Sequence, residues 1–211
     1  MSVEIEKNLK LSVAPEMPAH LETSTLEGRN KILGLWFFLG AEVVMFACMF
    51  GVYLALRNST AGGPTTQDLY EIPLVAIMTT ILLVSSLTSV LGIHEMRKGN
   101  FRGVQLWFGV TVLLGAAFLS LEIYEFFHYV DMGHTFTSSA FGTAFYTLVG
   151  THGAHVLFGV LWISGLLYNT RKEGLTDFTA PKFYVASLYW HFIDVVWVFI
   201  FTVVYLMGMV G

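Results

Sequence analysis

Five apolar runs, each long enough to cross a bilayer, limit what this chain can fold into. They cover roughly residues 32–56, 72–93, 104–127, 140–168 and 183–209. About 20 apolar residues span the hydrocarbon layer, and in an open chain only helices satisfy the backbone there. The sequence therefore predicts an all-α, polytopic membrane protein with five transmembrane helices. The composition agrees, with 55% hydrophobic and only 12% charged residues, and we expect no nucleic-acid partner.

The chain before the first run differs in composition from the rest. Residues 1–30 mix acidic and basic side chains and lack the apolar stretch of a cleaved secretory signal. We interpret them as a polar cytoplasmic tail, followed by a five-helix membrane domain over residues 31–211. Ser24 and Glu27 have the spacing of a capping box ahead of the first helix. The lone Cys48 leaves no disulfide to form within the chain.

The basic residues are distributed unequally between the two sides of the predicted membrane. Ten of the eleven fall on the side of the amino terminus, namely Lys7, Lys10, Arg29, Lys31, Arg97, Lys98, Arg102, Arg171, Lys172 and Lys182. Arg57 falls on the other side. Under the positive-inside rule, the amino terminus is cytoplasmic and the carboxyl terminus outside. Aromatic residues are expected at the outer boundary, namely Tyr53, Tyr70, Tyr129 and Tyr205.

Seven ionisable residues fall inside the predicted spans. They are Glu42, Glu122, Glu125, His152, His155, His191 and Asp194. At 1.5 Å of rise per residue, all except the two glutamates of the third span lie near the midplane and could meet at one depth. A charged group there costs roughly 2.5–3.5 kcal/mol, so it needs a partner or a function. We interpret the seven as an intramembrane polar network.

Several interpretations of this network remain open from the residues alone. Glu125 and His128 have the Glu-x-x-His spacing of a carboxylate-bridged di-iron site, although they lie further out than the other candidate ligands. His155 and His191 could be axial haem ligands on facing helices. Hydrogen bonds that hold the helices in register are the interpretation we favour. A proton relay through Glu42 also stays open, but the second span contains no charged residue to continue it.

A basic patch lies at the predicted inner boundary. Arg97, Lys98 and Arg102 are candidate contacts for anionic lipid headgroups, although the positive-inside rule also explains them. The five spans show no internal repeat, which argues against a transporter built from inverted halves.

Four segments resemble the signature segments of subunit III of the haem–copper terminal oxidases. They are FLGAEVVMF (38–46), LEIYEF (121–126), GTHGAHV (150–156) and YWHFIDVVWVFIF (189–201). The resemblance covers the chain from about residue 28 to residue 211, with the segments in the family's order. The likeness is greatest to the bacterial cytochrome c oxidases of the caa3 type. Subunit III of a menaquinol oxidase is the alternative within the family, and a di-iron or haem enzyme is the alternative outside it.

This resemblance implies an accessory subunit of a proton-translocating respiratory complex in the bacterial plasma membrane. It implies no catalytic, cofactor-binding or metal-binding residue in this chain, with haem and copper in partner subunits. The expected partners are subunit I in direct contact, subunit II and a small subunit IV. The implied roles are to stabilise subunit I, to support its proton uptake and to bind phospholipid.

The resemblance also assigns roles to four intramembrane residues. Glu42 matches the family position associated with carbodiimide reactivity, and His155, His191 and Asp194 match positions of interhelical hydrogen-bonding groups. In the family's longer form, the lipid cleft lies between two amino-terminal helices and the other five helices. The chain lacks those two helices. If this chain has such a cleft, a helix from another subunit must complete it.

Overall fold

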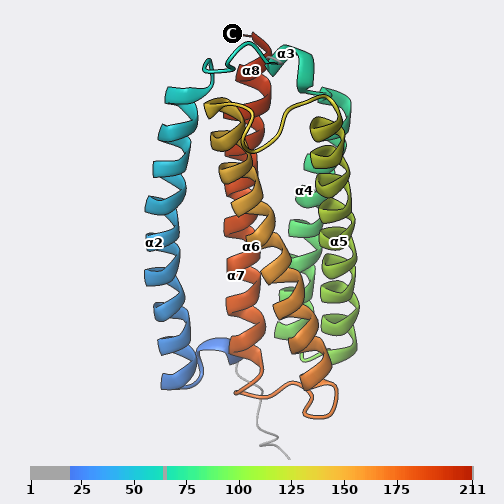
Figure 1. The fold of residues 1–211 in the computed structure, drawn as a ribbon. Coiled ribbons are helices and arrows are strands. Elements are labelled where there is room, and N and C mark those ends of the chain that lie inside the picture. Colours follow the sequence, from blue (N-terminus) through green and yellow to red (C-terminus); the bar gives the residue numbers. More distant parts are fainter. Residues whose placement is uncertain (1–19, 64–65, 211) are drawn as a thin grey trace, which may run out of the picture.

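The computed structural model describes residues 20–63 and 66–210, and in it the chain is a bundle of long helices (Figure 1). Five of them are long and apolar enough to cross a membrane. These are α2 (Leu26–Leu56), α4 (Ile72–Arg97), α5 (Phe101–Asp131), α6 (Ala140–Thr170) and α7 (Ala180–Ile200), the last continued by the π-helix η2 (Phe201–Leu206) and α8 (Met207–Val210). The short elements are η1 (Leu21–Thr23) and α3 (Thr66–Leu69). The predicted all-α fold with five spans is confirmed, and the side on which each terminus lies stays a prediction.

Three of the long helices, α2, α5 and α6, begin after a residue whose polar side chain caps the first turn. α2 begins at Leu26, where the Thr25 side chain accepts a hydrogen bond from the backbone of Gly28 at 3.0 Å. Ser24 is not the cap, because its hydroxyl donates to the carbonyl of Leu21 at 2.8 Å. The capping box predicted from Ser24 and Glu27 is therefore wrong, because the cap is Thr25, one residue later.

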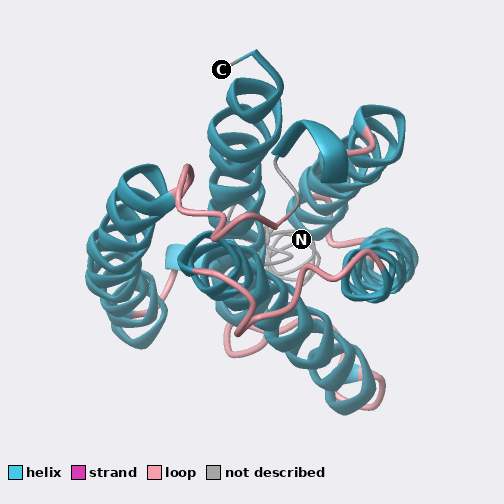
Figure 2. Cartoon of the chain, turned by 45° about the horizontal axis from the view of Figure 1, so that its top comes forward, coloured by secondary structure: helices cyan, strands magenta, loops and turns pink. Residues whose placement is uncertain are grey.

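The five long helices divide into a group of four and one more exposed helix. α5 packs on α4 and α6, and α7 packs on α6 and α4, so these four enclose a common interior. α2 packs against α6 and α7, on the side away from α5 (Figures 1 and 2). Fewer of its side chains are buried than in the other long helices.

One tryptophan joins the four enclosed helices. Trp190 of α7 is 1% exposed, and its indole nitrogen donates to the Ser85 hydroxyl of α4 at 2.9 Å. Its ring lies against Gly115 of α5 and Gly159 of α6, where added Cβ atoms would lie 2.6 and 2.9 Å from it. Small residues let membrane helices approach closely, and here two glycines make the slot that the indole fills.

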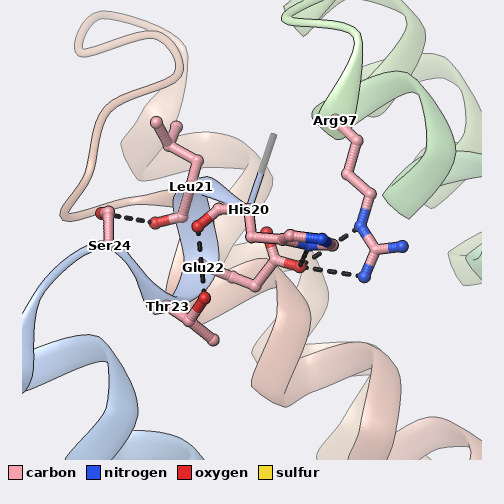
Figure 3. A network of polar contacts seen from close by, with 6 residues as sticks. All are labelled: His20, Leu21, Glu22, Thr23, Ser24 and Arg97. Atoms are coloured by element: carbon pink, nitrogen blue, oxygen red, sulfur yellow. Dashed lines mark hydrogen bonds and ion pairs between the residues drawn. The ribbon is translucent and has the colours of Figure 1, made fainter. Parts of the chain in front are cut away.

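The segment before α2 is tied to the end of α4 (Figure 3). Glu22 of η1 is 2% exposed, and one of its oxygens accepts hydrogen bonds from Arg97 at 2.9 and 3.2 Å. His20 Nδ1 lies 3.5 Å from the same oxygen. Because η1 also packs against α7, this part of the predicted tail belongs to the folded bundle. The predicted boundary at residue 30 falls inside α2.

Candidate functional site: polar residues inside the bundle

Glu42 of α2 and His155 of α6 form a pair across the helix interface. Glu42 Oε2 lies 3.1 Å from His155 Nε2, and the two side chains are 14% and 19% exposed. His155 Nδ1 lies 2.7 Å from the carbonyl oxygen of Thr151, which can only accept, so Nδ1 carries a hydrogen. The bond to Glu42 then requires one more proton, on the carboxyl or on the imidazole. The two side chains therefore link α2 to α6.

The other midplane residues lie in two further places. His152 is fully buried, with Nε2 3.3 Å from the carbonyl oxygen of Ile193 in α7. His191 Nδ1 lies 2.6 Å from the Ser86 hydroxyl of α4. Asp194 is 5% exposed, and neither of its oxygens has a hydrogen-bond partner among the described residues. The residues predicted to meet at one depth therefore form three separate groups, between α2 and α6, α6 and α7, and α4 and α7.

The two glutamates of α5 have different surroundings. Glu122 is 3% exposed and its carboxylate lies directly against Gly153 of α6, where a Cβ atom would collide with it. Glu125 accepts hydrogen bonds from the hydroxyls of Tyr129 at 2.6 Å and Tyr205 at 3.0 Å. Glycine at position 153 thus makes room for one carboxyl, while two phenols hold the other.

The four tyrosines that the sequence predicts near the outer membrane boundary are buried inside the bundle, and their depth in the membrane stays a prediction. Tyr53 and Tyr205 have no exposed surface, and Tyr129 and Tyr70 are 1% and 6% exposed. The hydroxyls of Tyr53 and Tyr70 lie 3.3 Å apart, and the rings of Tyr70 and Tyr205 lie 4.7 Å apart. Buried phenols need polar partners, and here Glu125 and the other phenols provide them.

The candidate metal and haem ligands each lie against other partners in the bundle. Glu125 points to its two tyrosines, while His128 lies on the exposed side of α5, with Nε2 3.7 Å from Glu71. Over residues 20–63 and 66–210, no three His, Cys, Asp or Glu side chains form a group that could hold a metal ion. His155 and His191 are engaged with Glu42 and Ser86.

The predicted basic patch is largely engaged with carboxylates of this chain. Arg97 pairs with Glu22, and Lys98 with Glu95 at 3.1 Å. Arg102 is exposed and has no ion pair with any described residue.

A second pair of cations, which sequence patterns missed, lies at the same end of the bundle. The ammonium groups of Lys31 and Lys182 lie 4.4 and 3.9 Å from the centre of the Phe178 ring. Both lysines border a groove of about 470 Å³ between α2, α6 and α7. The aromatic residues that line it are Phe38, Phe158, Trp162 and Tyr189.

The fold and the polar groups define a multi-pass membrane protein. Its three intramembrane histidines hydrogen-bond to other groups of the bundle, as do the carboxylates of Glu42 and Glu125. A family model described as cytochrome c oxidase subunit III matches residues 22–209. The chain belongs to this family, and it is a bacterial oxidase subunit III.

Relatives from two branches of the family are similar over nearly the whole chain. The chain is 61% identical to cytochrome c oxidase subunit 3 of Bacillus sp. (strain PS3), over 98% of this chain and 99% of the relative. It is 63% identical to cytochrome c oxidase subunit 3 of Bacillus subtilis (strain 168), over 94% and 96%. Quinol oxidase subunit 3 of the same strain is 51% identical, over 92% and 95%.

The Glu42→Gln variant is expected to lose carbodiimide labelling of this chain while the fold stays nearly intact. Carbodiimides attack protonated carboxyls in apolar surroundings, and the Glu42 carboxyl is partly accessible and lies 3.1 Å from His155 Nε2. Mass spectrometry of the labelled chain measures the effect, and Glu122→Gln is the matched control because that carboxyl is almost fully buried. Labelling that persists in Glu42→Gln would show that another carboxyl reacts.

A buried histidine in the loop between α5 and α6 makes the stability of the fold depend on pH. His134 is 1% exposed among the rings of Phe141 and Tyr146, and burial lowers its pKa below the ordinary value near 6.5. As pH falls below about 6.5, the unfolded chain takes up this proton first, so stability is lost with acidification. We expect the melting temperature in detergent to fall more between pH 7.5 and 5.5 in the native chain than in His134→Phe. Equal falls would contradict this origin.

Proposed function

We propose that this chain is the non-redox accessory subunit of a cytochrome c oxidase, in direct contact with the catalytic subunit I. Its expected companions are subunit II and a small subunit IV, and its role is to stabilise subunit I and support its proton uptake. The observation that carries the proposal is the 61–63% identity to cytochrome c oxidase subunits 3 over nearly the whole chain. Haem and copper are expected in the partner subunits.

The arrangement of the polar residues supports a role without redox chemistry. His152, His155 and His191 each make a hydrogen bond to another group of the bundle. Glu125 is held by two phenols. Interhelical hydrogen bonds of this kind stabilise membrane helices against one another, as a rigid support for a neighbouring subunit requires.

Subunit III of a menaquinol oxidase is the second candidate function. It is supported by the 51% identity to a quinol oxidase subunit 3 over 92% of the chain. The lower identity makes it the weaker candidate.

The deciding experiment is purification of the tagged chain in mild detergent from its own bacterium. The reduced-minus-oxidised visible spectrum is recorded, and every co-purifying protein is identified. We expect haem a bands together with larger partner chains, one of which carries covalent haem c. Haem a with menaquinol-driven oxygen uptake and no haem c would select the second candidate. A lone chain with its own iron would overturn both.

Phospholipid binding is the further part of this proposal. Lys31 and Lys182 can hold an anionic headgroup where the apolar groove can take an acyl chain. These two lysines join the candidate headgroup contacts because they border the groove. Lys31 also pairs with Glu27 at 2.6 Å, as Arg97 and Lys98 pair with carboxylates of their own.

The lipid proposal predicts a selective loss of anionic lipid. The double variant Lys31→Gln and Lys182→Gln should retain less phosphatidylglycerol on purification, with zwitterionic lipid unchanged. The matched control is Lys172→Gln at the same end of the bundle, which lies outside the groove. Lipid analysis of the purified chain measures both. Unchanged phosphatidylglycerol in the double variant would place the lipid elsewhere.

A further inference from the structure

The loop between α5 and α6, residues 132–139, lies at the end of the bundle that holds the carboxyl terminus (Figure 1). α5 ends there in a Schellman cap, in which the N–H of Gly133 donates to the carbonyl of Val130 and that of His134 to the carbonyl of Tyr129, both at 2.9 Å. Gly133 has the left-handed backbone that this cap requires, with φ of +85°. In such caps, the side chain at the position of His134 frequently packs as an apolar group on the helix. Here the position holds a titratable residue.

His134 packs as an apolar group would. It is 1% exposed, and its ring centre lies 4.9 Å from that of Phe141 and 5.5 Å from that of Tyr146. The rings of Phe145 and Tyr129 follow at 5.8 and 6.5 Å and complete an aromatic cage. In the described part of the chain, the buried Nε2 atom has no hydrogen-bond partner. The cage therefore suits a neutral imidazole, because burying an ion without a partner is strongly unfavourable.

The groups that face the ring do not compensate a positive charge on it. The titratable ones are the phenols of Tyr129 on α5 and Tyr146 on α6, which keep their protons well above neutral pH. Glu125 lies beyond Tyr129, whose hydroxyl donates to it at 2.6 Å. Within residues 20–63 and 66–210, the ion pairs of histidine involve three other histidines. Ring faces attract a cation, but this attraction replaces only part of the hydration that a buried ion loses. Burial accordingly lowers the pKa of His134.

His134 is also the point at which the loop is fastened to both helices. Its N–H bonds to α5, and its carbonyl accepts a hydrogen bond from the Tyr146 hydroxyl of α6 at 2.7 Å. Further along, the N–H of Phe141 donates to the carbonyl of Ser59 at 3.2 Å and joins the start of α6 to the connection after α2. A ring that leaves the cage takes the backbone of His134 with it, so the cap of α5 and the bond to Tyr146 open together.

We propose that residues 132–139 form a pH-sensitive switch, in which protonation of His134 releases its ring from the aromatic cage and opens the cap of α5. The proton comes from water at this end of the bundle and stays on the imidazole. In the open form the imidazolium is hydrated, and Tyr129 becomes accessible with Glu125 behind it. The switch regulates access to these two buried groups, and it does not depend on the identity of the partner subunits.

Hydrogen–deuterium exchange of the full-length chain in mild detergent tests the switch at pH 7.5 and 5.5, with labelling times scaled for the intrinsic pH dependence of amide exchange. The reporting amides are those of His134 and Phe141. A proton taken up by the open form, at the ordinary pKa near 6.5, raises the opening constant by up to about tenfold between these pH values. The cap of α4 is the matched control, because Gly99 and Asn100 make the same pair of backbone bonds at 3.0 Å each and asparagine does not titrate.

We expect protection at the cap of α5 to fall on acidification while protection at the cap of α4 stays constant. Equal losses at both caps would indicate a general effect of acid, and unchanged protection would show that the ring stays in its cage. Either result would overturn the proposal.

Two variants identify the group that titrates. His134→Phe keeps an apolar ring in the cage and leaves Glu125 unchanged, so the pH effect should disappear, and an effect that persists would also overturn the proposal. Tyr146→Phe loses the bond to the His134 carbonyl, so opening should become more frequent at both pH values while the ratio between them is kept. If His134→Phe does not fold, the comparison of the two caps in the native chain still decides the question.

Discussion

Replacing Trp190 by alanine is expected to destabilise the bundle by about 3–5 kcal/mol, the range for removing a fully buried aromatic side chain. Four helices lose a common contact, because the indole fills the slot at Gly115 and Gly159 and donates to Ser85. Unfolding of the isolated chain in detergent measures the loss. Trp36→Ala is the control, since that side chain is 58% exposed.

The conservative variant Trp190→Phe separates packing from hydrogen bonding. Phenylalanine keeps most of the ring but leaves the buried Ser85 hydroxyl without its indole donor, which should cost about 1 kcal/mol. A loss as large as that of Trp190→Ala would mean that the hydrogen bond dominates. A small effect in both variants would show that the four helices do not depend on this side chain.

Gly115→Ala is expected to destabilise the bundle by about 1–3 kcal/mol through overpacking. The new methyl group would lie 2.6 Å from the ring of Trp190 and 2.9 Å from Val160. Gly109→Ala on the same helix is a matched control, because nothing described lies within 4 Å of its Cβ position. That control should be neutral or stabilised by up to about 1 kcal/mol, through helix propensity.

Thermal unfolding of the two alanine variants in one detergent makes the comparison direct. A combined variant, Gly115→Ala with Trp190→Phe, should lose less than the sum of the two single losses, because the smaller ring makes room for the methyl group. If Gly115→Ala behaves like Gly109→Ala, the slot is wider than the structure indicates.

The number and type of spans could be predicted because bilayer thickness sets a length that an apolar run must meet. The pairing of the polar residues could not. Counting along a helix gives depth, but the direction of a side chain around the bundle depends on which helices are neighbours. Glu42 and His155 meet at the predicted depth, whereas His152 and His191, at similar depth, lie at other interfaces.

The tyrosines show a second limit. Glu125 and Tyr129 are four residues apart, a spacing that brings side chains together on a helix, so their bond could have been predicted. Tyr205 joins them from η2, whose π-helical turn changes the direction in which its side chains point. No pattern in the apolar run signals that turn. The pairing of Lys31 and Lys182 around Phe178 is likewise hidden by separation along the chain.

The bond between Glu22 and Arg97 has a consequence for the order of biosynthesis. The ribosome completes α2 first, yet the arginine that holds its leading segment lies at the end of α4, and the helices on which α2 packs are α6 and α7. The first helix must therefore stay in the membrane without its final neighbours until the last helix has been made. Its own apolar surface, and not contact with the bundle, has to keep it inserted during that interval.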